Sequence, residues 1–340
     1  MNNSTILCQS LSRLFFVLIL TVQGCFFSVN NSEAADVRST SHNTSKKLVY
    51  LVSDLRIPFW DIMWRGIKSR ATSLGYEIEV YSAKNSAKRE LEFTLKVLKE
   101  NVSGIIVSPT NSSACTTILK FAQSARVPVV ISDIGTDGGD YVSYISSNNR
   151  DGAYRLGRIL AKSLTDAGWQ NGRIGIIAIP QMRENGRART AGFMQAMDEA
   201  GIKGSDIKQQ VTFSYQETYD YSEELIEKTP DLRAIWLQGS DRYQGALDAI
   251  ADTGKTGEIL LISYDAEPIF LDLIPQGVLV GAAMQQPYLM GEEAVMSLHR
   301  HLNGQMVEKE RQLPVLAVSQ ENINEQLSLI RRNVLGIENQ

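Results

Sequence analysis

The feature that most constrains this chain is an alternation of short apolar runs and amphipathic stretches that extends from residue 47 to residue 318. The apolar runs have the length and composition of buried strands, and the stretches between them have helical periodicity. This alternation predicts an α/β fold in which helices cover both faces of parallel sheets. The strand–helix unit recurs in both halves of the chain, which predicts two similar lobes rather than a solenoid.

The predicted strands are short and apolar, and helices occupy the intervals between them. We predict strands at residues 48–53, 77–82, 104–108, 127–132, 173–179, 209–213, 234–238, 259–264 and 278–283. We predict helices at residues 59–74, 87–100, 113–125, 151–167, 186–200, 222–229, 242–253 and 291–302. A strand at 313–319 and a helix at 321–333 follow.

A glycine-containing connection, DIGTDGGDYVSY at 133–144, interrupts the alternation where the first lobe would lead into the second. The segments after Gln285 are expected to return to the first lobe, so the chain would cross between lobes near residues 147, 285 and 315. Several crossings form a hinge rather than a flexible tether. The predicted divisions are a signal peptide (1–35), a flexible leader (36–46), an N-terminal lobe (47–147 and 286–318), a C-terminal lobe (148–285) and a C-terminal helix extension (319–340).

The first 35 residues have the pattern of an export signal. Arg13 precedes LFFVLILTV at 14–22, which has the length of a signal-peptide apolar region and is short for a bilayer span. Cleavage after Ala34 or Ala35 would release a soluble protein. Alternatively, VQGC at 22–25 resembles a lipobox, in which Cys25 becomes a lipidated N-terminus. Both alternatives predict a periplasmic protein, and an uncleaved membrane anchor is the third alternative.

Composition and cysteine usage exclude several classes of protein. The net charge of −4, with 21% charged residues, favours neither nucleic acid nor an anionic membrane surface as a partner. Cys115 is the only cysteine beyond the signal region, so no intrachain disulfide forms without Cys25. We expect Cys115 to be a small buried helix residue.

The sequence offers no convincing catalytic or metal-binding motif. Gly254-Lys255-Thr256 lacks the earlier glycine of a phosphate loop and ends a predicted helix. His299 and His301 lie on one late helix and are expected to be solvated rather than metal ligands. Without a suitable His or Cys base, acyl-transfer chemistry has no obvious machinery. We therefore expect neither an enzyme nor a bound cofactor or metal.

Polar or aromatic residues follow the predicted strands, and ligands of open α/β sheets bind beyond that edge. The segment LVYLVSDLRIPFW at 48–60 places two large aromatic rings just beyond the first strand. Rings pack on the C–H face of a sugar, while carboxylate, guanidinium and amide groups bind its hydroxyls. The alternative is that each polar residue caps a strand or forms an ion pair between the lobes. The candidate ligand-binding residues are Phe59, Trp60, Asp133, Arg189, Phe213, Asp265 and Gln285.

Eight stretches carry a specific resemblance across residues 47–318. They are VYLVSDLRIPFW, GYEIEVYSAKNSAKRELE, GIIVSPTNSSA, VPVVISDIG, GRARTAGFMQAM, TPDLRAIWLQGSD, LLISYDAEP and AAMQQPYLMG. They resemble the type I periplasmic sugar-binding proteins of the ribose/galactose-binding family, in particular its ribose-binding members. The resemblance implies two Rossmann-like lobes that close on one monosaccharide, a monomer, and delivery of the sugar to an ABC permease or a chemoreceptor.

The resemblance also implies roles for the candidate residues. The rings that would enclose the sugar are those of Phe59, Trp60 and Phe213. Asp133 and Asp265 match the carboxylates of the first and second lobes. Arg189, in preference to Arg187, matches the second-lobe arginine, and Gln285 matches a glutamine near the hinge.

Three positions depart from the ribose-binding pattern. Ile57 replaces an Asn, Ile134 replaces an Arg, and Gly239 replaces an Asn, although Ser240 or Asp241 could substitute for the last. A site that loses directed hydrogen bonds discriminates against the ligand that needs them. We therefore expect a deoxy sugar, a larger hexose or a small signal molecule with an apolar edge rather than ribose.

The C-terminal extension also departs from the pattern. Leu327, Ile330 and Leu335 are expected to dock on the first lobe, and the alternative is a surface for a membrane partner.

Taken together, these sequence features predict a sugar-binding protein that feeds an ABC transporter. The alternative function is a periplasmic co-receptor for a sensor histidine kinase or chemoreceptor. Transcription regulators with these lobes carry a helix-turn-helix where this chain has an export signal, so we do not expect a transcription regulator.

Overall fold

The computed structural model describes residues 46–337. The predicted signal peptide, almost all of the leader and Cys25 lie outside the described residues. Residues 43–340 belong to one compact unit, which is the subject of everything below. Within the described part of the chain, no helix combines the length and the apolar character that a membrane crossing requires.

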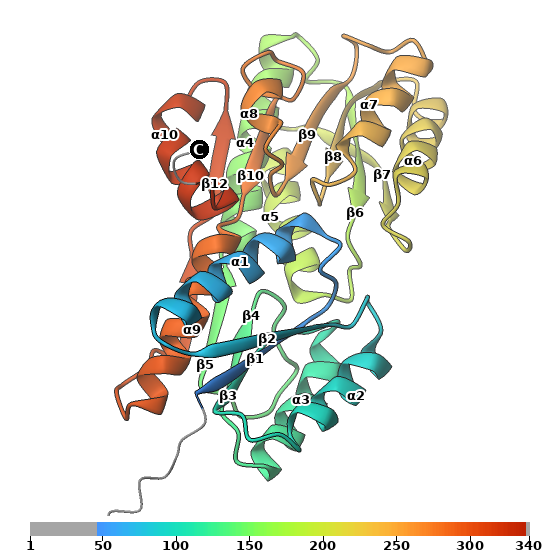
Figure 1. Cartoon of the computed structure of the whole chain (residues 1–340). Helices are drawn as coiled ribbons and strands as arrows, with labels where there is room; N and C mark the ends of the chain where they lie inside the picture. The colour runs from blue at the N-terminus through green and yellow to red at the C-terminus, as the bar shows by residue number, and fades with distance from the viewer. Residues whose placement is uncertain (1–45, 338–340) are drawn as a thin grey trace, which may run out of the picture. The chain divides into compact units, whose positions relative to one another are not determined.

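Two six-stranded sheets organise this unit (Figure 1). The first is parallel throughout, in the order β11 (Glu310–Leu313), β5 (Ser143–Ser147), β4 (Val129–Ser132), β3 (Gly104–Ser108), β1 (Lys47–Val52) and β2 (Glu77–Ser82). The second has the order β12 (Leu316–Ser319), β10 (Gly281–Met284), β9 (Leu260–Tyr264), β8 (Leu232–Leu237), β6 (Arg173–Ala178) and β7 (Lys203–Gln209). Only β12 is antiparallel to its neighbour in that sheet. The predicted α/β fold with two parallel sheets is confirmed.

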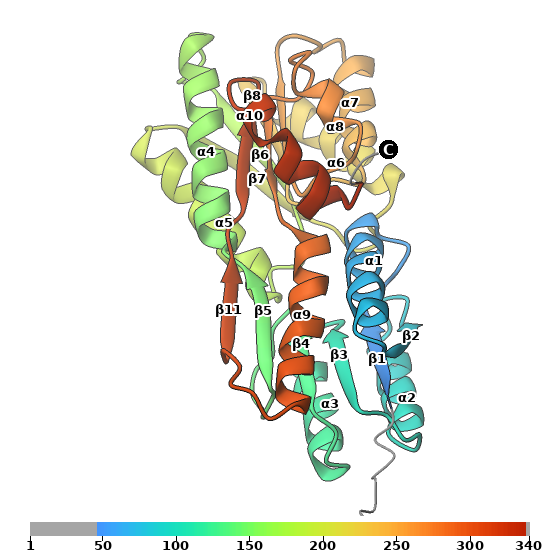
Figure 2. The ribbon, with the colours of Figure 1, turned by 60° about the vertical axis from the view of Figure 1, so that its left-hand side comes forward.

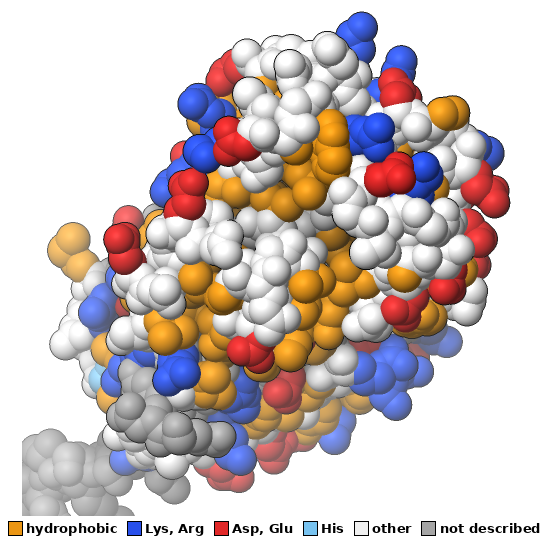
Figure 3. All heavy atoms as spheres, turned by 90° about the horizontal axis from the view of Figure 1, so that it is seen from above, with side chains coloured by type: hydrophobic (Ala, Val, Ile, Leu, Met, Phe, Trp, Pro, Cys, Tyr) orange, Lys and Arg blue, Asp and Glu red, His pale blue; other side chains and the backbone are white. Residues whose placement is uncertain are grey.

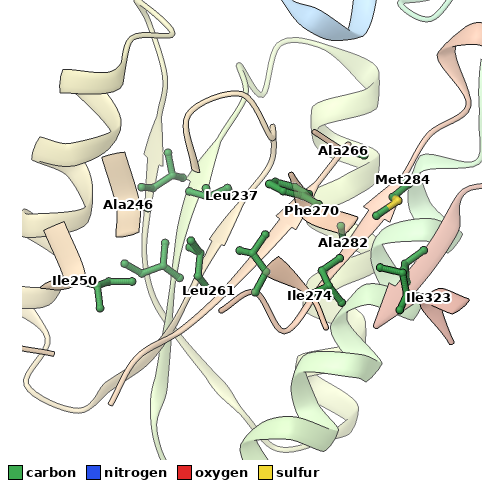
Figure 4. Close-up of a cluster of buried hydrophobic side chains, with 14 of the residues drawn as sticks. Leu237, Ala246, Ile250, Leu261, Ala266, Phe270, Ile274, Ala282, Met284 and Ile323 are labelled. Carbon is green, nitrogen blue, oxygen red and sulfur yellow. The ribbon is translucent and has the colours of Figure 1, made fainter. Parts of the chain in front are cut away.

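Helices cover both faces of each sheet, and four hydrophobic clusters fill the interfaces. On the first sheet, α1 (Pro58–Ser73) and α9 (Pro287–Leu302) lie on one face, with α2 (Ala87–Val97) and α3 (Ser112–Ser124) on the other. On the second, α4 (Asn149–Asp166) and α5 (Glu184–Glu199) lie opposite α6 (Tyr215–Lys228), α7 (Tyr243–Asp252) and the short α8 (Phe270–Leu273). Figure 4 shows Leu237 and Leu261 of the sheet with Ala246 and Ile250 of α7 in one of these clusters. Cys115 is buried and unpaired in another, as expected.

The position of a strand in its sheet explains how well its predicted bounds agree with the observed ones. The central strands β1, β3 and β4 are buried along their whole length, apart from the first residue of β1, and therefore form continuous apolar runs. The edge strand β7 is polar and half-exposed, so its sequence carries no such run. The strand predicted at 209–213 was therefore wrong, and Phe213 lies in the loop that follows β7.

Two other boundaries differ from the prediction. The strand predicted at 313–319 is two strands, because Pro314 breaks the backbone ladder between β11 in the first sheet and β12 in the second. Residues 316–318 therefore belong to the second sheet and not to the N-terminal lobe. The helix predicted at 222–229 begins earlier, at Tyr215, where the Ser214 hydroxyl caps it by accepting from the N–H of Glu217.

The chain passes between the two sheets three times: after β5, after β10 and between β11 and β12. The predicted three crossings are confirmed. Helix α9 follows the second crossing and packs on α1, and both helices lie side by side in Figures 1 and 2. Their backbones touch, since a Cβ at Gly66 would lie 2.2 Å from the carbonyl oxygen of Tyr288.

The C-terminal extension contains α10 (Ile323–Leu329) and a π-helical turn, η1 (Ile330–Leu335). The expectation that its apolar side chains dock on the first lobe was wrong, although η1 also packs against α9 of that lobe. Ile330 and Leu335 are buried in the hydrophobic core of the second sheet, because β12 delivers the chain to that sheet's face, and Leu327 is half-buried. The extension also contacts the first lobe through Arg65 of α1, which donates to the carbonyl of Leu335 at 2.8 Å.

Candidate functional site

Two aspartates end corresponding strands of the two sheets in the same way. Asp133 follows β4 and Asp265 follows β9, with φ of +69° and +68°. Each backbone N–H still continues the ladder: that of Asp133 donates to the carbonyl of Ile145 at 3.0 Å, and that of Asp265 to the carbonyl of Ala283 at 2.8 Å. Among residues with a Cβ, Asp is one of the few that tolerates this left-handed conformation. Both sheets therefore end a central strand in a carboxylate.

Both aspartates line one cleft, whose other lining residues come from the loops and helix starts of both lobes. It encloses about 470 Å³ of empty space, part of it open to solvent. All the predicted binding residues line it, namely Phe59, Trp60, Asp133, Arg189, Phe213, Asp265 and Gln285. The structure thus brings these seven residues together, while their contact with a ligand stays a prediction.

The first-lobe side of the cleft is aromatic. Pro58 opens α1, so Phe59 and Trp60 lie in its first turn, with their ring centroids 6.3 Å apart in an edge-to-face arrangement. The indole N–H of Trp60 donates to Asp133 Oδ2 at 3.2 Å. Burial raises the pKa of Asp133 to about 6. This side therefore offers ring surface beside a carboxylate that the indole orients.

Arg189 is fixed at the second-lobe side of the cleft by neighbouring polar groups. Its side chain is only 3% exposed, and its guanidinium donates to Asn149 Oδ1 at 2.9 Å and to the carbonyl of Gln238 at 2.7 Å. It lies 3.5 Å from Asp265 Oδ2 and stacks over the ring of Tyr264, 3.9 Å from the centroid. A guanidinium held this firmly keeps its direction when a ligand arrives.

Asp265 and Gln285 form a second polar pair. Gln285 Nε2 donates to Asp265 Oδ1 at 2.6 Å. Burial raises the pKa of Asp265, and the neighbouring Arg189 opposes that rise. Gln285 Oε1 is buried and accepts no hydrogen bond from any described residue. Because a buried acceptor without a donor is costly, it is suited to accept one from a ligand.

Phe213 is held in an unusual backbone conformation, with φ of +54°. The carboxylate of Glu217 accepts hydrogen bonds from the backbone N–H groups of Val211, Thr212 and Phe213, which stabilises this loop. Left-handed conformations of bulky residues are strained and concentrate at functional sites. The guanidinium of Arg242 donates to the carbonyl of Phe213 and lies 5.4 Å from its ring centroid.

Of the three positions that depart from the ribose-binding pattern, two line the cleft and one does not. Ile57 and Gly239 line the cleft. Ile134 does not, because it packs in the hydrophobic core of the first sheet. Of the two suggested substitutes for the missing Asn, Asp241 lines the cleft, whereas the Ser240 hydroxyl donates to Glu267 at 2.8 Å.

Sequence reasoning missed two arginines of the cleft, Arg183 and Arg242. Both lie at the N-terminal ends of helices, several residues beyond the strands β6 and β8, rather than directly at a strand end. The signal available in the sequence was weak: Arg183 lies in the loop before the helix predicted at 186–200, and Arg242 is the first residue of the helix predicted at 242–253. A search limited to strand ends could not find them.

Another hollow, of about 1210 Å³, lies on the surface over α4 and α5. It is broad and open, and no aromatic side chain lines it. On the face shown in Figure 3, basic and acidic side chains are interspersed with exposed apolar ones. A mixture of this kind creates no single-sign field for a polyanion. The cleft between the sheets, which is lined by aromatic and ionisable side chains, is therefore the candidate site.

A sequence family described as a periplasmic binding protein domain matches residues 48–306. The chain belongs to this family of periplasmic binding proteins. It is 26% identical over 282 residues to the ribose import binding protein RbsB of Haemophilus influenzae, covering 83% of this chain and 94% of that protein.

Solved structures share the fold. A carbohydrate transporter solute-binding protein from Agrobacterium radiobacter, in complex with D-arabinose, superposes with a TM-score of 0.78 at 18% identity, covering 86% of this chain and 99% of that one. An ABC transporter periplasmic solute-binding protein from Actinobacillus succinogenes with bound D-allose gives 0.76 at 19% identity, covering 82% and 99%. These likenesses show the type I periplasmic binding protein fold.

Proposed function

We propose that this protein is a periplasmic solute-binding protein that closes on a monosaccharide or sugar-like ligand and delivers it to an ABC transporter. The observation that carries the proposal is the cleft, where carboxylates from corresponding strand ends of both lobes meet aromatic rings. The names of the similar proteins, a ribose import protein and solute-binding proteins with bound sugars, support the same ligand class.

The side chains of the cleft suit a hydroxylated ring. Asp133 and Asp265 accept hydrogen bonds from hydroxyls, Arg189 donates, and Gln285 has a free acceptor oxygen. Trp60 and Phe59 present apolar ring surface beside Asp133. No covalent chemistry is required of these groups, and we propose a binding protein rather than an enzyme.

Ligand binding is coupled to hinge closure in this proposal. A ligand that contacts both lobes favours the closed arrangement in proportion to its differential affinity for that arrangement. The three crossings between the sheets would guide this motion. The family and the N-terminal export pattern support a periplasmic location, and we propose an inner-membrane ABC permease as the partner. Attachment through Cys25 is the alternative to a soluble form.

The first test is a thermal-unfolding screen of the purified protein against pentoses, hexoses, deoxy sugars and sugar derivatives. Because ligand binds the native state, at least one compound should raise the melting temperature in a concentration-dependent way. Titration calorimetry then gives its affinity. A melting temperature unchanged by every compound would contradict the proposal.

The second test removes one carboxylate of the cleft. In Asp265→Ala, the ligand loses an acceptor and the buried Arg189 loses its partner, so binding should disappear and the free energy of unfolding should fall by roughly 1–3 kcal/mol. Calorimetry and urea unfolding measure the two effects. The matched control is Asp198→Ala on the exposed side of α5, which should change neither. Unchanged ligand affinity in Asp265→Ala would place the site elsewhere.

A further inference from the structure

The cleft contains three arginines, and two of them have a carboxylate partner. Arg189 lies 3.5 Å from Asp265. Arg242 forms an ion pair with Asp241 and also donates to a backbone carbonyl. These two guanidinium groups are therefore neutralised by the protein itself.

Arg183 differs from the other two. It lies just before α5, is half-buried, and lines the cleft. Its guanidinium carbon is 5.7 Å from the centroid of the Phe213 ring. Its side chain makes no hydrogen bond or ion pair with any residue in the range 46–337. Because Arg183 lines the cleft and has no acceptor among the described residues, its guanidinium is available to an acceptor that a ligand brings, and closure of the cleft would make an unpaired cation there costly.

Within the protein, Asp133 on the opposite lobe acts on Arg183 electrostatically. The two form no ion pair, and Asp133 is instead hydrogen-bonded to Trp60. A ligand seated between the lobes would separate Asp133 from Arg183. Closure around a neutral ligand would then bury the Arg183 guanidinium without an anionic partner.

We propose that Arg183 is a ligand-binding residue and that the ligand is a monosaccharide derivative carrying a carboxylate, such as a uronic acid. A guanidinium donates in a planar fork that matches a carboxylate bidentately, whereas a hydroxyl supplies no compensating charge. The hydroxyls of the same ligand bind Asp133 and Asp265. This inference rests on the proposed sugar-binding function and specifies the class of sugar.

The experiment compares matched pairs by titration calorimetry on the purified protein: D-galacturonate with D-galactose, and D-glucuronate with D-glucose. The inference predicts that at least one uronate binds at least about tenfold more tightly than its parent hexose, which is the effect of one charge-assisted contact. Hexoses that bind as tightly as or more tightly than both uronates would overturn the inference and leave the proposed function intact. If neither uronate binds, the inference is overturned, whereas the proposed function is contradicted only if the wider sugar screen also finds no ligand.

Variants of Arg183 test whether the preference for uronates over hexoses depends on this residue. Arg183→Gln keeps length and polarity but removes the charge, and should weaken uronate binding about tenfold while leaving hexose binding within about threefold. Arg183→Lys should restore part of the loss. The control Arg158→Gln makes the same charge change on the exposed face of α4, in the same lobe, and should preserve the uronate preference. A preference that survives in Arg183→Gln would overturn the assignment to Arg183.

Discussion

Individual residues of the cleft combine burial with ionisable groups, and Asp133 shows the consequence. The residue is 4% exposed, its carboxylate accepts one hydrogen bond from Trp60, and burial raises its pKa to about 6. The ionised form is the one that accepts hydrogen bonds from two ligand hydroxyls. Ligand binding and protonation of this group therefore compete.

This competition predicts a pH dependence of affinity. Between pH 8 and 7 Asp133 is ionised and affinity should be constant. As pH falls through 6 the carboxyl gains a proton, and the dissociation constant should rise about tenfold per pH unit below that point. Calorimetry from pH 8 to pH 5 checks this. Asp133→Asn should bind more weakly at pH 8 and lose most of the pH dependence, and an unchanged slope in that variant would assign the titration to another group.

Among the elements, the C-terminal extension has the least predictable role. Its amphipathic pattern predicted a docked helix, but its partner is the second sheet. Arg332 of η1 pairs with Glu292 of α9 at 2.6 Å, and Arg65 of α1 donates to the carbonyls at the end of η1. The extension therefore contributes apolar side chains to one lobe and polar contacts to the other.

The contribution of the extension's apolar side chains to stability can be tested at Leu335, with Leu329 as the matched control. Leu335 is 1% exposed in the second-lobe core, whereas Leu329 is 41% exposed six residues earlier. Leu335→Ala should lower the free energy of unfolding by about 2–5 kcal/mol, because it leaves a cavity in a packed core. Leu329→Ala should change it by less than about 0.5 kcal/mol. Urea unfolding measures both, and equal effects would mean that the extension does not dock as described.

The molecule as a whole contains several buried or half-buried carboxyl groups whose pKa is raised by desolvation. Glu90 has a pKa of about 7 and accepts hydrogen bonds from the N–H and hydroxyl of Thr110, and Asp133 has a pKa of about 6. The pKa values of Asp265 and Glu267 are also raised. Each group favours the protonated form in the folded state more than in the unfolded chain.

These raised carboxyl pKa values predict that the free energy of unfolding falls as pH rises. The stabilisation from a raised carboxyl pKa is fully present below the unfolded value, about 4, and is lost as pH rises through the folded values of about 6 to 7. The ligand-free protein should therefore melt at a higher temperature at pH 5.5 than at pH 8. Calorimetric scans across this range measure it. Glu90→Gln should reduce the slope between pH 6 and 8, and a melting temperature that rises steadily to pH 8 would contradict the linkage.

The sequence by itself determined the two-sheet α/β architecture and most of the candidate site. The central strands are buried on both faces, so they appear as continuous apolar runs, and the residues that follow them must lie at one edge of a sheet. Asp133 and Asp265 were found for this reason. The polar edge strand β7 carries no such run, which is why the location of Phe213 in a loop was missed.

Only the tertiary structure decided which segments meet across the molecule. It placed Ile134 in the core, brought Arg183 and Arg242 into the cleft, and docked the C-terminal extension on the second sheet. Local patterns define the buried face of an element, but not the distant element that covers it. That choice depends on packing and charge contacts between residues far apart in the chain, and these exist only once both sheets have formed.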